Sequence, residues 1–138
     1  MTSLHVNIWA VLAATLATMA VGMLWYSPLL FARAWMKAHG YTPEKLAGMK
    51  KSMGRAYAVS FACYLVMAAA LALLVQMTGS QSMLDGAKLG LVCWIGFAAT
   101  IGLTANMFSD KPLATYLIDV GYQLVYIIVM GAILAAWQ

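Results

Sequence analysis

Four long apolar runs constrain this chain of 138 residues more than any other feature. They cover residues 6–26, 56–76, 86–108 and 113–137. A helix needs about 20 residues to cross roughly 30 Å of hydrocarbon, because it rises about 1.5 Å per residue. Lipid offers no partner to backbone N–H and C=O groups, and the runs lack the alternation that is typical of barrel strands. We therefore expect four transmembrane helices.

The amino-acid composition agrees with this expectation and argues against most soluble enzymes. Hydrophobic residues make up 64% of the chain and charged residues only 9%. A soluble domain of this size would need a far more polar exterior. We predict an all-α fold with a single domain, residues 1–138, that is an integral membrane four-helix bundle.

The distribution of positive charge predicts the orientation of the bundle. Seven of the eight Lys and Arg residues lie between the first and second runs or between the third and fourth. Loops rich in Lys and Arg stay in the cytoplasm. We expect residues 27–55 and 109–112 to be cytoplasmic and both termini to lie outside. The first run leads into Pro28 without a small-residue cleavage site, so we expect it to remain in the mature protein.

The segment between the first two runs is expected to form a short amphipathic helix. Ser27 and Pro28 are typical of a helix start, and Gly40 of a helix end. Thr42 and Pro43 repeat the start signal, and the helical pattern continues from there into the second run. The segment is also predicted to bind anionic head groups of the lipid bilayer, rather than nucleic acid, through its basic residues. These are Arg33, Lys37, Lys45, Lys50, Lys51 and Arg55.

One carboxylic acid residue falls inside a predicted span. Asp119 lies seven residues past Pro112, which places it about 10 Å into the hydrocarbon at the rise of a helix. A charged side chain that faces lipid costs roughly 2.5 to 3.5 kcal/mol on insertion scales, so we expect Asp119 to face the bundle. Its stripe of the helix carries further hydrogen-bonding side chains, which are Tyr116, Gln123 and Tyr126.

Two states of Asp119 stay open at this point, because no Lys or Arg is expected at its depth. A protonated Asp119 would hydrogen-bond Tyr64, Thr100 or a neighbouring chain, which is a structural role. An ionised Asp119 would lie beside a bound cation or water, which is a binding or transport role. The candidate site for an ion, a proton or a small polar solute consists of Asp119, Gln123, Tyr116, Tyr126 and Asn106. The alternative is a structural or accessory protein whose polar stripe joins helices or subunits.

No signature of catalysis, of a cofactor or of a metal site is found in the sequence. It lacks a nucleophile with an adjacent base, a phosphate-binding loop and metal-ligand spacing, so we expect no enzyme activity. The methionines suit core packing better than copper binding. Cys63 is predicted about 10 Å from the inner face of the membrane and Cys93 about 10 Å from the outer face, so we expect no disulfide between them within one chain. Ser109 and Asp110 are predicted to cap the fourth helix.

Small residues predict close contacts between helices. Gly86 and Gly90 form a GxxxG pattern, and the first run carries a continuous face of small residues. The residues of this face are Ala10, Ala14, Thr18 and Gly22. Because four short spans enclose little interior, we expect a homo-oligomer.

Two stretches resemble a known family. They are Gly22–Phe31 with Trp35 and Met36, and Asn106–Phe108 followed by Pro112 and Tyr116–Gln123. These stretches are similar to small bacterial four-helix membrane proteins that are catalogued only as a domain of unknown function. The resemblance covers nearly the whole chain and includes Asn106 and Asp119. It implies a protein of the bacterial inner membrane and supplies no substrate.

Overall fold

The computed structural model describes residues 3–138, and every regular element in that range is a helix. The elements in chain order are α1 (Ile8–Trp25), α2 (Ala32–His39), α3 (Pro43–Met49), the 3-10 turn η1 (Lys50–Ser52), α4 (Met53–Met77), α5 (Met83–Cys93), the π-helical turn η2 (Trp94–Ala98), α6 (Ala99–Phe108) and α7 (Leu113–Ala136). The predicted all-α fold is confirmed.

Four of these helical stretches are long and apolar enough to cross a membrane. They are Ile8–Trp25, Pro43–Met77, Met83–Phe108 and Leu113–Ala136. Each overlaps one of the four runs in the sequence, so the chain is a multi-pass membrane protein. The helix that begins at Pro43 runs through η1 into α4, as the start signal at Thr42 predicts.

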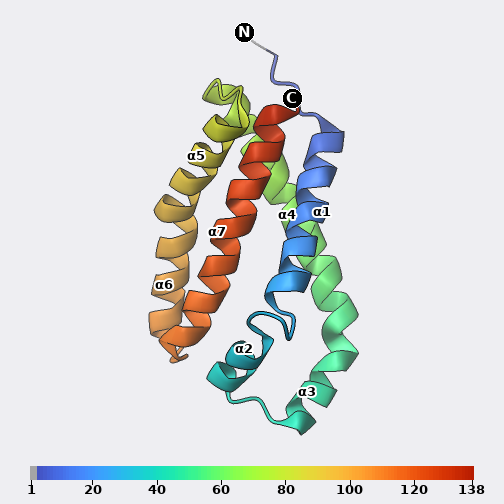
Figure 1. Cartoon of the computed structure of the whole chain (residues 1–138), viewed down its shortest axis with the longest axis vertical. Coiled ribbons are helices and arrows are strands. Elements are labelled where there is room, and N and C mark those ends of the chain that lie inside the picture. Colours follow the sequence, from blue (N-terminus) through green and yellow to red (C-terminus); the bar gives the residue numbers. More distant parts are fainter. Residues whose placement is uncertain (1–2) are drawn as a thin grey trace.

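Helix α7 lies in the middle of the bundle (Figure 1). The α5–α6 stretch covers one side of it, while α1 and α4 pack on the other. Both ends of the drawn chain lie at one end of the bundle, and α2 and α3 lie at the opposite end. The most deeply buried side chains come from α1, α4 and α7, for example Ala14, Val75 and Met130.

Glycines allow the backbones of α5 and α7 to touch. A Cβ atom on Gly86 would lie 1.9 Å from the carbonyl oxygen of Gly131, and a Cβ on Gly90 would lie 2.6 Å from that of Ile127. The predicted GxxxG contact therefore forms within one chain. The small-residue face of α1 is also used within the chain, since Ala10 and Ala14 are buried in the core.

The connection between α1 and α2 differs from the prediction at its start. The Ser27 hydroxyl donates to the carbonyl oxygen of Leu24, so it closes α1 instead of capping a new helix. Residues 27–31 form turns, and α2 begins only at Ala32. The predicted end is confirmed, because Gly40 adopts the left-handed conformation (φ 67°) that glycine tolerates best.

The predicted cap of the fourth span is wrong. The Ser109 hydroxyl donates backwards to the carbonyl oxygen of Asn106, and Asp110 adopts a positive φ of 56°. Helix α7 begins after Pro112 without a side-chain cap. These residues form a tight turn between α6 and α7, in which the Ser109 side chain satisfies a carbonyl oxygen at the end of α6.

Candidate functional site

Asp119 is half-buried on α7, six residues past its first residue, or about 9 Å along the helix. Its Oδ1 atom accepts two hydrogen bonds. The Tyr26 hydroxyl donates at 2.5 Å and the indole Nε1 of Trp35 at 3.2 Å. Both donors are neutral groups. Within residues 3–138, no Lys or Arg side chain donates a hydrogen bond to this carboxylate.

Both donors reach Asp119 because the chain folds back under the bundle after α1. Tyr26 is the C-terminal cap of α1, and Trp35 lies one turn into α2. The turn between them is fixed by backbone hydrogen bonds, including one from the amide of Phe31 to the carbonyl oxygen of Trp25. The end of α1 and the start of α2 therefore meet the same face of α7.

Trp25 also binds α7, at the residue that precedes Asp119. Its indole Nε1 donates to the carbonyl oxygen of Ile118 at 3.0 Å. The ring fits because Gly121 has no side chain, since a Cβ there would lie 3.0 Å from the Trp25 ring. Consecutive aromatic residues of α1 thus bind consecutive residues of α7, and Asp119 lies at the centre of this junction.

An aromatic cluster extends from Asp119 toward α4. We define it as Tyr26, Trp35, Tyr64, Tyr122 and Tyr126. The Tyr122 ring centroid lies 5.4 Å from that of Tyr26 and 4.7 Å from that of Tyr126, in edge-to-face contacts. The Tyr122 hydroxyl donates to the carbonyl oxygen of Thr18 at 2.9 Å and also contacts the Tyr64 hydroxyl at 3.2 Å. Polar and aromatic groups thus form a continuous row from α2 to α4.

His39 lies on the other side of Trp35. Its ring centroid is 4.3 Å from that of Trp35 and 4.8 Å from that of Tyr41, with which it is stacked. The Lys45 ammonium lies 5.4 Å from the Tyr41 ring centroid. Burial lowers the pKa of His39 below its ordinary value; the charge of Asp119 opposes this shift, whereas Lys111 and Lys45 add to it.

The predicted site residues are not all brought together. Tyr126 belongs to the aromatic cluster, and Gln123 is half-buried on α7. The Tyr116 hydroxyl, however, donates to the carbonyl oxygen of Ala99 at 2.7 Å, so it joins α7 to α6. Asn106 is buried and donates to the carbonyl oxygen of Pro112 at 3.4 Å, which braces the turn before α7.

The two partners of Asp119 that were predicted within the chain, Tyr64 and Thr100, are wrong. Tyr64 contacts Tyr122, and the Thr100 hydroxyl donates to carbonyl oxygens of its own helix. The donors are instead Tyr26 and Trp35. Both side chains combine an aromatic ring with a hydrogen-bond donor, which marks them in the sequence as candidates for a polar contact. The sequence does not indicate which helix they contact.

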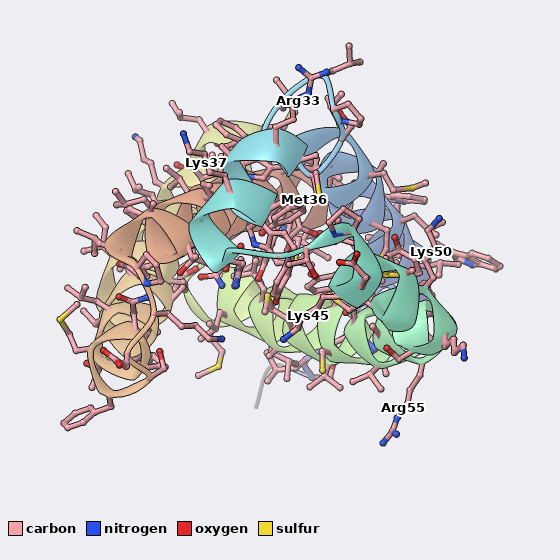
Figure 2. All side chains as sticks on the ribbon, turned by 90° about the horizontal axis from the view of Figure 1, so that it is seen from below. Arg33, Met36, Lys37, Lys45, Lys50 and Arg55 are labelled. Carbon is pink, nitrogen blue, oxygen red and sulfur yellow. The ribbon has the colours of Figure 1, made fainter. Side chains whose placement is uncertain are left out.

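Basic residues surround the end of the bundle at which α2 and α3 lie. Arg33, Lys37, Lys45, Lys50, Lys51 and Arg55 are all exposed. Figure 2 shows Arg33 and Arg55 pointing outward on opposite sides, with Lys45 nearer the middle. In the part of the chain that the structure describes, no three His, Cys, Asp or Glu side chains are grouped so as to hold a metal ion.

The family model described as "Protein of unknown function (DUF1761)" matches residues 9–135. The chain belongs to the DUF1761 family. This match confirms the resemblance found in Gly22–Phe31 and Tyr116–Gln123. The matched range of this DUF1761 chain runs from α1 to the end of α7 and contains Asp119 with both of its donors. Comparisons with curated proteins and with solved structures find no match.

Proposed function

We propose that this membrane protein binds a proton, a small ion or a small polar solute at Asp119 and passes it across the membrane. The observation that supports this function best is a carboxylate inside a helical bundle that is bonded to neutral donors. An ionisable residue within a membrane span favours a functional role by default. We assign the chain a binding or transport role rather than catalysis.

The hydrogen bonds to Asp119 stabilise a negative charge without neutralising it. The Tyr26 hydroxyl, at 2.5 Å, would stabilise an ionised carboxylate, because a hydrogen bond to a charged acceptor is stronger than one to a neutral acceptor. Both bonds end on Oδ1, so in this part of the bundle the lone pairs of Oδ2 are available to a further group. Because a charge in a low-dielectric region attracts an opposite charge strongly, a proton or a cation is the favoured partner.

The proposed setting is the bacterial inner membrane, with both termini outside and the α2 end in the cytoplasm. The orientation rests on the positive charge of residues 27–55, which stays inside by the usual rule. Exposed basic side chains such as Arg33 and Arg55 would bind anionic head groups at about 1 kcal/mol each. We also propose a homo-oligomer, since one chain of four spans encloses little interior. With the α2 end in the cytoplasm, the bound species would reach Asp119 from the cytoplasmic side.

A structural role is the second candidate, and a specific observation favours it. Trp25, Tyr26 and Trp35 all donate hydrogen bonds to residues 118 or 119 of α7. In this role Asp119 would hold the start of α2 against the bundle, and the protein would carry no ion or solute across the membrane. The two roles differ in whether removal of the titrating group changes the flux through the protein.

The test is flux through purified protein in liposomes, with imposed gradients of protons, of sodium or potassium ions, or of a small polar solute. Asp119→Asn keeps the size and one acceptor oxygen but cannot ionise. We expect it to lower the flux at least tenfold. Asp85→Asn is the matched control and should leave the flux unchanged. Asp85 is exposed in the first turn of α5, and α5 begins at the end of the bundle opposite α2 and α3 (Figure 1). If no flux depends on Asp119, the transport proposal is wrong.

A further inference from the structure

We propose that the species bound at Asp119 is a proton and that His39 takes it up from the α2 end of the bundle. This inference rests on the proposed function and specifies its substrate. It is drawn from two observations. The first is the set of groups that contact the Asp119 carboxylate, and the second is the position of the His39 imidazole on the other side of the Trp35 ring.

The groups that surround Asp119 suit a proton better than a metal cation. Calcium and magnesium ions require about six or more oxygen ligands. Asp119 is instead contacted by a hydroxyl that donates to it and by the indole N–H of Trp35, which can only donate. The rings of Tyr26 and Trp35 pack against each other beside the carboxylate, with centroids 6.0 Å apart. A proton needs one lone pair and no further ligand.

Trp35 connects the carboxylate to His39. Its Nε1 lies 3.2 Å from Asp119 Oδ1, and its ring lies against the imidazole with centroids 4.3 Å apart. The Nε2 atom of His39 is buried and has no hydrogen-bond partner among residues 3–138, whereas Nδ1 is not enclosed in this way. Nε2 thus faces the protein, and Nδ1 is the nitrogen left for contact with water; carrying protons between two such sides is one of the roles that suit histidine.

Three charged groups act on His39 from the elements packed around it. Asp119 on α7 favours the imidazolium, while Lys111 in the α6–α7 turn and Lys45 on α3 disfavour it. The flanking rings of Trp35 and Tyr41 also favour a cation between them. An imidazolium formed here is therefore drawn toward Asp119 and repelled from the basic surface.

The proton reaches Asp119 in two steps. A hydronium ion in the cytoplasmic water gives a proton to Nδ1 of neutral His39, so that an N–H bond forms and an O–H bond breaks. The Trp35 indole must then leave Oδ1, because it can donate a proton in a hydrogen bond but cannot accept one. The N–H bond on Nε2 breaks, a water molecule that enters the vacated space carries the proton, and an O–H bond forms on the Asp119 carboxylate. The products are water, a neutral carboxylic acid and neutral His39 in its other tautomer.

The experiment combines proton flux with titration of the histidines. His39→Gln should lower the proton flux in liposomes at least tenfold. His5→Gln should leave it unchanged, since His5 is exposed ahead of α1 and its amide donates to Gln76 near the C-terminal end of α4, far from α2. In nuclear magnetic resonance titrations of the protein in micelles, Asp119→Asn should lower the pKa of His39, because it removes the charge that favours the imidazolium. Equal thermal stability of wild type and His39→Gln excludes misfolding as the cause.

The outcomes separate this inference from the proposed function. If Asp119→Asn abolishes proton flux while His39→Gln does not change it, His39 is not the uptake group, although the proposed function stands. If an Asp119-dependent flux of sodium or of a solute is found without proton flux, the proton is the wrong species. An unchanged pKa of His39 in Asp119→Asn contradicts the coupling between the two groups. Absence of every Asp119-dependent flux overturns both proposals.

Discussion

Gly86→Ala is expected to destabilise the bundle by about 3 kcal/mol or more. The new Cβ atom would lie 1.9 Å from the carbonyl oxygen of Gly131 and 2.6 Å from the Cβ of Ala135. The first of these is a backbone atom in the C-terminal part of α7, so no side-chain rotation relieves the clash. Helix α5 must move away from α7, and with it the whole third span loses its main contact.

Gly96→Ala is the matched control for this prediction. Gly96 lies in the same span, and a Cβ atom there meets nothing within 4 Å. Alanine stabilises a helix by about 1 kcal/mol relative to glycine, so this variant should be neutral or slightly stabilising. The measurement is thermal unfolding of the purified protein in detergent. Equal unfolding temperatures for Gly86→Ala and the wild type would show that α5 and α7 do not touch as described.

Asp119→Leu is expected to release α2 from the bundle. The substitution leaves the Tyr26 hydroxyl and the Trp35 indole without their acceptor, and each unpaired donor costs about 1 to 3 kcal/mol where water cannot reach it. Helix α2 contains no fully buried residue of its own, so little else holds it in place. Its amide hydrogens should exchange at least tenfold faster than in the wild type.

Asp119→Asn is the control for this second prediction, because the amide oxygen can still accept both hydrogen bonds. Exchange in residues 32–39 should then stay within about threefold of the wild type, a difference of about 0.6 kcal/mol. Hydrogen exchange followed by mass spectrometry measures both variants. Slow exchange of α2 in Asp119→Leu would mean that Asp119 does not fasten this helix, and the structural candidate would lose its support.

The spans are predictable from sequence because the membrane imposes a local requirement. About 20 apolar residues suffice, whatever the rest of the chain does. The helix starts and ends were predictable only where one signal was unambiguous, as at Gly40 and Thr42. Ser27 and Pro28 suit a helix start and a turn equally well, and here the turn is formed because Ser27 closes α1.

The centre of the site was also predictable, but its partners were not. Asp119 is conspicuous as a carboxylate in an apolar run. Tyr26 and Trp35 reach it through a turn whose direction no pattern in residues 27–31 specifies. Tyr116 lies only three residues from Asp119, yet it is offset by about 60° around the helix and faces α6. Residues at this spacing therefore lie on the same side of a helix, but they do not necessarily contact the same partner.

The most direct test of the account is whether Asp119 gains and loses a proton inside the folded protein. Infrared difference spectra of wild type and Asp119→Asn in lipid, recorded over a series of pH values, isolate the carbonyl band of this one protonated carboxyl group. A binding site for a proton or cation predicts that the band appears on acidification and disappears again as the pH rises. A band that persists unchanged at every pH in the folded protein would mean a permanently protonated, structural aspartate and would contradict the account.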